Sequence, residues 1–252
     1  MNSLTTKEYW SEGWKKIKLP ARFFFNDYSH LIISGLIDKF INKKHTNFLE
    51  IGGCPGRWAD YFNTKHSMVC DSMDYDENNV KLTKENYKLL GIKGDVFLGD
   101  ITNSEFEPRK KYNIVLSNGL VEHFVDSSEV FRNHVKFLKS RGLLIIGVPN
   151  IKKSWFYDFL AKFDKIGYAG YRHVDKSELL KYAKDNKLEV YFCNYIGVFN
   201  LGLINFNVSN SFIYKLFIAV HLIFSFITKT LKIKKESLIF SPYIFLIAKK
   251  YE

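Results

Sequence analysis

The chain has 252 residues and a formal net charge of +11 at pH 7, and its 46% hydrophobic and 25% charged residues are typical of a globular protein, not of a disordered one. Cys54, Cys70 and Cys193 include no close pair and have no histidine cluster beside them, so neither a disulfide framework nor a zinc site is indicated. The polar N-terminus lacks the basic-then-apolar order of a signal peptide. We therefore expect a single domain over residues 1–252, located in the cytoplasm.

The order of the predicted elements indicates an α/β fold. Residues 1–46 show helical apolar spacing and are expected to form helices that lead into the domain. From residue 47 onward, short apolar runs alternate with amphipathic segments, which predicts a mostly parallel sheet flanked by helices. The predicted strands cover 47–51, 67–73, 96–98, 114–117, 143–148, 189–196 and 243–248, and the predicted helices cover 57–63, 77–90, 127–139, 155–163 and 176–186. The last strand follows a long insertion, so we expect it to pair antiparallel at one edge of the sheet.

The strongest local signal is a predicted strand that runs into a glycine-rich turn at residues 48–58. This segment resembles motif I of class I S-adenosylmethionine-dependent methyltransferases, an acidic residue followed by Gly-x-Gly-x-Gly, through Glu50, Gly52, Gly53 and Gly56. The resemblance implies a Rossmann-like fold, with loop glycines along the methionine half of the cofactor and an acidic residue that orients it. Cys54 stands where the middle glycine is usual, and its side chain is expected to crowd the cofactor. Taken alone, the glycines are equally explained by a tight turn between a strand and a helix.

Acidic residues follow the next two predicted strands. In the family that residues 48–58 resemble, Asp74 stands where an acid accepts hydrogen bonds from both ribose hydroxyls, and Tyr75 is placed against adenine. Asp71 is the rival for the ribose, although we predict it to lie within the strand. Asp100 and Ile101 resemble the adenine site, where the acid accepts from the exocyclic amine and the apolar residue packs on the ring; a turn with a helix cap is the structural alternative. Because the cofactor is a sulfonium cation, a basic protein needs carboxylates near it.

The fourth predicted strand leads into residues 117–124, which resemble the stretch that borders cofactor and acceptor in many small-molecule methyltransferases. The resemblance places Ser117 and Asn118 beside the cofactor. His123 is a candidate base for the proton of an acceptor hydroxyl, because the pKa of histidine lies nearest neutrality. The alternative is a structural histidine that caps or bridges the helix that follows.

A second histidine lies in the loop at residues 170–175, which resembles a Gly-His-x-Arg-like loop in one branch of the family. Arg172 is a candidate for holding an anionic acceptor and His173 is a second candidate base. A solvated loop in which Asp175 caps the next helix explains the same residues.

An apolar insertion at residues 203–235 contains a predicted helix, and lysines follow it. Residues 212–228 are interrupted by Lys215 and His221 and are slightly short for a membrane span. A buried or lid helix on the acceptor side is one reading. An aromatic-rich helix beside a basic run is also typical of a peripheral membrane anchor over residues 212–235, which suits a lipid-linked acceptor.

Together these features predict a cofactor-binding core at residues 47–150 and an acceptor side at residues 151–252. The predicted function is methyl transfer from S-adenosylmethionine to an oxygen or nitrogen of a small-molecule, glycan or lipid-linked acceptor of anionic character, without a metal. No motif for binding nucleic acid accompanies the scattered lysines. The alternative is a non-catalytic protein that keeps the fold as a binding or membrane-associated module, with Cys54 as its motivating departure.

Overall fold

The computed structural model describes residues 3–14, 17–103, 105, 107–162, 168–200, 211–233 and 236–251, with the backbone alone for 11–12 and 211–218. Within these ranges, seven strands form one sheet in the order β3-β2-β1-β4-β5-β7-β6. The strands are β1 (Asn47–Ile51), β2 (Val69–Asp74), β3 (Val96–Leu98), β4 (Tyr112–Asn118), β5 (Leu138–Pro149), β6 (Leu188–Ile196) and β7 (Tyr243–Lys250). The helices are α1 (Lys7–Trp14), α2 (Tyr28–Ile37), α3 (Arg57–His66), α4 (Glu77–Leu90), α5 (Ser128–Lys136), α6 (Trp155–Ala161), α8 (Lys176–Asp185) and α9 (Ser211–Thr230), with 3-10 turns η1 (Asp38–Phe40) and η2 (Val121–His123).

The sheet is the mostly parallel α/β sheet that the sequence predicts. Strands β1 to β5 pair in parallel, and the chain proceeds from β1 outward through β2 and β3 on one side and through β4 and β5 on the other. The order of the strands therefore reverses between β1 and β4. In open α/β sheets, ligands bind in the crevice at the carboxyl ends of the strands at such a reversal.

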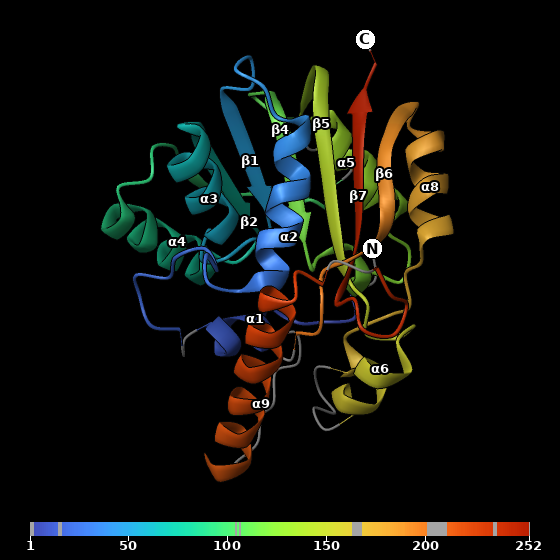
Figure 1. Ribbon diagram of the computed structural model, residues 1–252. Coiled ribbons are helices and arrows are strands. Elements are labelled where there is room, and N and C mark those ends of the chain that lie inside the picture. The colour runs from blue at the N-terminus through green and yellow to red at the C-terminus, as the bar shows by residue number, and fades with distance from the viewer. Residues whose placement is uncertain are drawn as a thin grey trace.

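Helices cover both faces of the sheet (Figure 1). One apolar layer joins the sheet to α2, α3 and α4 through buried residues such as Ile33, Phe62 and Val80. The opposite layer joins the sheet to α5 and α8 through Phe131 and Leu179. The amphipathic spacing of these helices and the alternation along the strands thus give a three-layer α/β core.

The predicted position of the last strand was wrong, although its direction was confirmed. Strand β7 runs antiparallel to both of its neighbours, but it lies between β5 and β6 and leaves β6 at the edge. The physical reason is burial, because Tyr243 to Ala248 is an apolar run that is buried on both faces, whereas β6 is partly exposed along most of its length. A continuous apolar run is typical of an internal strand.

The two ends of the chain partly follow the predictions. Residues 1–46 contain α1 and α2, separated by a non-helical segment that includes a cis peptide bond between Leu19 and Pro20. The predicted apolar helix is α9, which extends from Ser211 to Thr230. Residues 203–210, 234 and 235 of the predicted insertion and residue 163 of the helix predicted at 155–163 lie outside the described residues. Within the described ranges, no helix combines the length and the apolar character that crossing a bilayer requires.

Candidate functional site

The loop after β1 has a shape that its glycines make accessible. Gly52 and Gly56 have φ angles of +66° and +90°, which side-chain-bearing residues adopt only with strain. A Cβ on Gly53 would lie 2.1 Å from Oε1 of Glu50, and a Cβ on Gly56 would lie 2.6 Å from Cε1 of Tyr87. The glycines therefore let the loop fold tightly against Glu50 and α4.

Glu50 lies beneath this loop and faces α3. Its Oε2 accepts a hydrogen bond from the backbone N–H of Ala59 at 3.0 Å, and its side chain is buried. Burial raises the pKa of Glu50 to about 8, against the lowering effect of the backbone hydrogen bonds. Glu50 thus holds the loop to the first turn of α3. The backbone N–H groups of that turn have no acceptor within the helix, so they favour a side chain that accepts hydrogen bonds.

Cys54 is held in the protein interior. Its thiol lies 3.7 Å from the backbone oxygen of Asn79 in α4, and burial raises its pKa to about 12. The side chain that stands at the middle glycine position therefore packs against α4.

Asp74 and Tyr75 end β2 at the carboxyl edge of the sheet. Oδ1 of Asp74 accepts from the N–H of Asp76 at 3.0 Å and from Nδ2 of Asn79 at 3.3 Å. Burial raises the pKa of Asp74 to about 6, so the carboxylate is ionised at pH 7. Tyr75 is half-buried, and Nζ of Lys7 in α1 lies 5.2 Å from the centre of its ring.

Asp71 has a structural role, as its place within the strand predicts. Its Oδ2 accepts from Nζ of Lys110 at 2.6 Å and from the hydroxyl of Tyr112 at 2.8 Å, and its Oδ1 accepts from the N–H of Asp95 at 2.9 Å. Both oxygens are therefore engaged within the protein.

The segment after β3 lies beside the end of β2, because the N–H of Gly99 donates to the backbone oxygen of Asp74 at 2.9 Å. Asp100 is exposed, and its Oδ1 accepts from the N–H and from Oγ1 of Thr102, each at 2.8 Å. Ile101 is buried in the core layer of α5. The turn that the structural alternative predicts is present, and it places Asp100 on the same edge of the sheet as Asp74.

The end of β4 has two different polar residues. The hydroxyl of Ser117 lies 2.9 Å from Nε2 of His134 in α5 and is completely buried, so its side chain serves the core. Asn118 lies on the other side of the strand, and a Cβ on Gly147 would lie 2.2 Å from its Oδ1. The lack of a side chain at Gly147 therefore makes room for the Asn118 amide.

His123 follows β4 and connects three parts of the chain. Its Nδ1 lies 2.7 Å from the backbone oxygen of Gly170, and its ring contacts Trp10 of α1 and Tyr171 at centroid distances of 4.8 and 4.9 Å. Because a carbonyl oxygen only accepts, Nδ1 carries the proton and Nε2 carries the lone pair. Burial lowers the pKa of His123 to about 4. The structural role is therefore a bridge to distant parts of the chain and not, within the described contacts, to the helix that follows, and it leaves Nε2 with a lone pair.

Glu122 is a residue that the sequence reasoning missed. Its side chain is 1% exposed, and its Oε1 lies 3.4 Å from Nε2 of His123. Burial raises the pKa of Glu122 to about 8, so both side chains are neutral at pH 7 and the contact is not an ion pair. The sequence places Glu122 next to His123, but its backbone oxygen accepts from the N–H of Arg172, and His123 beside it contacts Trp10 of α1, so the enclosure comes from distant parts of the chain.

Several buried polar atoms at the end of β4 have no hydrogen-bond partner among the described residues: Oδ1 of Asn118, both carboxyl oxygens of Glu122 and Nε2 of His123. Buried polar atoms without a partner are rare in folded proteins and indicate a place for a ligand. All of these atoms accept hydrogen bonds, or do so once Glu122 ionises. They therefore fit a ligand that carries positive charge and N–H donors, as S-adenosylmethionine does at its methionine end.

The loop at residues 170–175 has the structural role that was weighed against a functional one. Arg172 makes a two-pronged ion pair with Glu178, with nitrogen–oxygen distances of 2.6 and 2.9 Å, and also donates to Ser127. Asp175 caps α8 through the N–H of Glu178 at 3.1 Å. His173 is exposed, and its Nε2 lies 3.8 Å from Asp175. The guanidinium of Arg172 is thus already occupied by protein groups.

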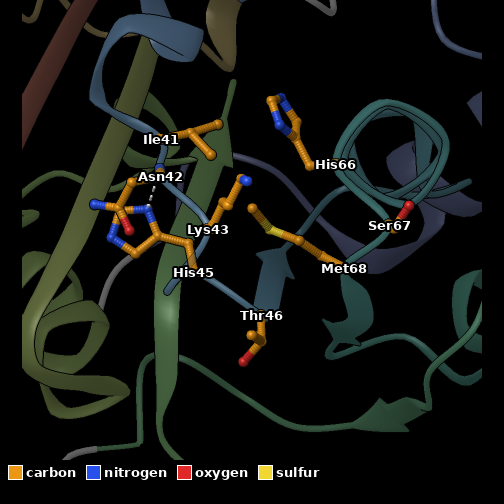
Figure 2. A pocket seen from close by; sticks show the side chains of 8 residues that line it. All are labelled: Ile41, Asn42, Lys43, His45, Thr46, His66, Ser67 and Met68. Atoms are coloured by element: carbon orange, nitrogen blue, oxygen red, sulfur yellow. Dashed lines mark hydrogen bonds between the residues drawn. The ribbon is translucent and has the colours of Figure 1, made fainter.

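A hollow of about 420 Å³ lies at the opposite edge of the sheet and is shown in Figure 2. Its lining residues come from the segments before β1 and β2. They are Ile41, Asn42, Lys43, His45, Thr46, His66, Ser67 and Met68. This hollow is therefore separate from the residues at the carboxyl ends of the strands. Within the described ranges, no group of three metal-ligating side chains is present.

Known proteins resemble this chain in sequence pattern and in fold. The family model of the methyltransferase domain matches residues 25–191, and no curated protein matches the chain. A SAM-dependent methyltransferase from Archaeoglobus fulgidus is 14% identical with a TM-score of 0.58, and the match covers 98% of this chain and 100% of that one. The YcgJ protein from Bacillus subtilis is 17% identical with a TM-score of 0.60, over 88% and 99% of the two chains. The chain belongs to the methyltransferase-domain family.

Proposed function

We propose that the protein transfers the methyl group to an oxygen or nitrogen of a small-molecule, glycan or lipid-linked acceptor, and that hydroxyl oxygen is the preferred atom. The observation that carries the proposal is the enclosed pair of Glu122 and His123 beside Asn118, where buried acceptor atoms lack partners. These residues lie on the β4 side of the strand-order reversal, between β4 and the loop at Gly170.

The carboxyl edge of the sheet supplies the groups for the cofactor. Gly52, Gly53 and Gly56 allow close backbone approach, and Glu50 orients the loop that contains them. Asp74 would accept from the ribose hydroxyls, with Tyr75 against the adenine ring, and Asp100 and Ile101 would hold the far side of that ring. The backbone of Ser117 and the side chain of Asn118 would border the methionine end. When bound, the cofactor supplies a methyl group on a positively charged sulfur, a reagent that is already activated.

His123 is the proposed base, and Glu122 is its positioning residue. The lone pair of Nε2 would take the proton of an acceptor hydroxyl as the oxygen–methyl bond forms and the methyl–sulfur bond breaks. A positive charge beside Glu122 lowers the pKa of its carboxyl, and the resulting carboxylate stabilises the protonated imidazole 3.4 Å away. His173 is the second candidate, but its exposed position 3.8 Å from Asp175 gives it no comparable enclosure.

The proposal places the protein in the cytoplasm, with membrane contact through residues 212–235. The three free cysteines, two of them buried, support a reducing compartment. The acceptor side comprises residues 151–252, where α6 and α9 lie beyond the carboxyl ends of the strands (Figure 1).

Incubation of the purified protein and cofactor labelled in the methyl group with a cell extract tests the acceptor class. The labelled products are then divided into an organic-solvent fraction, an aqueous fraction and a precipitate that contains protein and nucleic acid. These fractions distinguish lipid-linked, small-molecule and macromolecular acceptors. Label in the organic or small-molecule aqueous fraction supports the proposal, and His123→Asn should reduce it at least tenfold. Label confined to the precipitate would overturn it.

A further inference from the structure

Helix α9 presents apolar side chains to solvent. Val220 packs against the small core cluster that contains Tyr157, and Nε2 of His221 lies 3.4 Å from Oδ2 of Asp27 in the segment before α2. A surface helix of a globular protein usually turns its apolar face inward and its polar face outward. Here several large apolar residues of the helix are exposed instead, with exposed fractions of 61% at Leu222, 57% at Ile223, 69% at Phe226 and 42% at Ile227.

Helix α6 and the segment before β7 extend this surface. Trp155 and Phe159 lie one helical turn apart and are 65% and 59% exposed, whereas Tyr157 between them is buried. The ring of Phe240, 48% exposed, lies 5.8 Å from that of Phe156. Both helices pack on the same small core cluster and lie beyond the carboxyl ends of the strands (Figure 1). We call this surface the apolar face, and it comprises Trp155, Phe159, Leu222, Ile223, Phe226, Ile227, Leu231, Leu238 and Phe240.

The charges around the apolar face have one prevailing sign. The sequence from Val190 to Lys235 contains no Asp or Glu but includes five lysines. Lys229 and Lys232 are exposed at the end of α9, and Lys153 is exposed beside α6. Among the described acids nearby, Asp158 lies 2.7 Å from Lys162, and Glu236 accepts a hydrogen bond from the neutral amide of Asn194. Because the lysines outnumber these acids, the border of the apolar face carries a net positive charge.

We propose that the apolar face docks on the surface of an anionic lipid bilayer. Large aromatic and aliphatic side chains enter the boundary between headgroups and acyl chains, and lysines around them bind anionic headgroups. The charge favours this occupant over a second copy of the chain, because a symmetric contact would bring two faces with the same positive border together.

Docking has a consequence for the acceptor, which rests on the proposed function. The apolar face and the candidate site lie at the same end of the sheet, so docking brings the site to the lipid surface. The structure thus favours an acceptor that is held in the membrane, such as a lipid-linked glycan, over one that is free in solution.

Co-sedimentation of the full-length protein with lipid vesicles tests the docking without any acceptor. Vesicles of phosphatidylcholine mixed with phosphatidylglycerol should bind the protein at least tenfold more tightly than vesicles of phosphatidylcholine alone. Leu222→Ser with Phe226→Ser, and separately Lys229→Glu with Lys232→Glu, should each weaken binding tenfold or more. The matched controls on α4, Leu89→Ser and Lys84→Glu with Lys88→Glu, change residues that are equally exposed and should leave binding within twofold.

Equal binding of all these proteins, or no binding to either vesicle, would overturn the proposal. Light scattering of the protein without vesicles tests the alternative occupant, and a dimer that the two Leu222 and Phe226 substitutions dissociate would also overturn it. Calorimetric titration with S-adenosylmethionine in the absence of lipid distinguishes a failure of the docking proposal from a failure of the proposed methyl transfer. Variants that lose vesicle binding should keep the cofactor affinity of the unmodified chain.

Discussion

Oε1 of Glu122 lies 3.4 Å from Nε2 of His123, and both side chains are at most 3% exposed. Burial shifts their pKa values in opposite directions, to about 8 for the acid and to about 4 for the imidazole. The same enclosure therefore keeps both neutral at pH 7. A positive charge placed beside them would lower the pKa of Glu122 and ionise its carboxyl. Binding of the cationic cofactor should therefore release a proton from Glu122.

Glu122→Gln should make the protein more stable at high pH. Because the folded-state pKa of Glu122 is raised from 4.5, the unfolded state releases its proton first, and the free energy of unfolding falls as the pH rises from about 4.5 to about 8. The glutamine cannot ionise, so urea unfolding at pH 8.5 should show a gain of at least ~1 kcal/mol over the unmodified chain. Burial also raises the pKa of Glu50, so the unmodified Glu50 also makes stability fall as the pH rises. In Glu122→Gln the decrease of stability with pH should therefore become smaller but not disappear.

The exposed Glu85→Gln on α4 is the control for Glu122→Gln, and it should leave the pH dependence of stability unchanged. Calorimetry of cofactor binding in buffers with different ionisation enthalpies provides a second measurement. The unmodified chain should release a proton on binding at pH 7 and Glu122→Gln should release less. Equal proton release by the two proteins would contradict the prediction that Glu122 ionises when the cofactor binds.

Gly53→Ala should destabilise the fold by about 1–3 kcal/mol, because the added Cβ would lie 2.1 Å from Oε1 of Glu50 and force the buried carboxyl or the loop to move. Gly35→Ala in α2 is the matched control. A Cβ at Gly35 has no atom within 4 Å, and alanine favours the helix, so stability should rise by up to about 1 kcal/mol. Urea unfolding of both variants checks this contrast, which a neutral Gly53→Ala would contradict.

Arg172→Lys should lower stability by about 1–3 kcal/mol, since lysine cannot reproduce the paired contacts with Glu178. Arg22→Lys is its control. Arg22 is exposed and lies 3.7 Å from Asp60, so its substitution should change stability by less than about 0.5 kcal/mol. If Arg172→Lys instead kept full stability and lost acceptor turnover, Arg172 would hold an anionic acceptor as the sequence first suggested.

The sequence predicted the core of the fold well because each strand and helix there has its own periodic signal. The helix at 77–90 and the strands at 47–51 and 96–98 have the predicted bounds. The edge position predicted for the last strand was wrong, although the unbroken apolar run from Tyr243 to Ala248 was a signal for an internal strand. The edge position was predicted from the long insertion before the strand, although the apolar run indicates burial on both faces.

The candidate site was only partly visible in the sequence. Asp74 and Asp100 stand out because they follow strands, and the structure brings both to the predicted edge. Glu122 and the closeness of α1 depend on contacts between residues far apart in the chain, such as Trp10 with His123. Local patterns contain no information on such contacts, so these residues were recognised only from the three-dimensional arrangement.

Calorimetric titration with S-adenosylmethionine of the unmodified chain and of Asp74→Ala tests whether the cofactor binds at the carboxyl edge of the sheet, with Asp71→Asn as a control for a buried structural acid. We predict micromolar binding by the unmodified chain and at least tenfold weaker binding by Asp74→Ala, a loss of about 1.4 kcal/mol, while Asp71→Asn loses thermal stability but retains the affinity wherever it is folded. Absence of binding at millimolar cofactor, or equal affinity of Asp74→Ala, would contradict the assignment of the site.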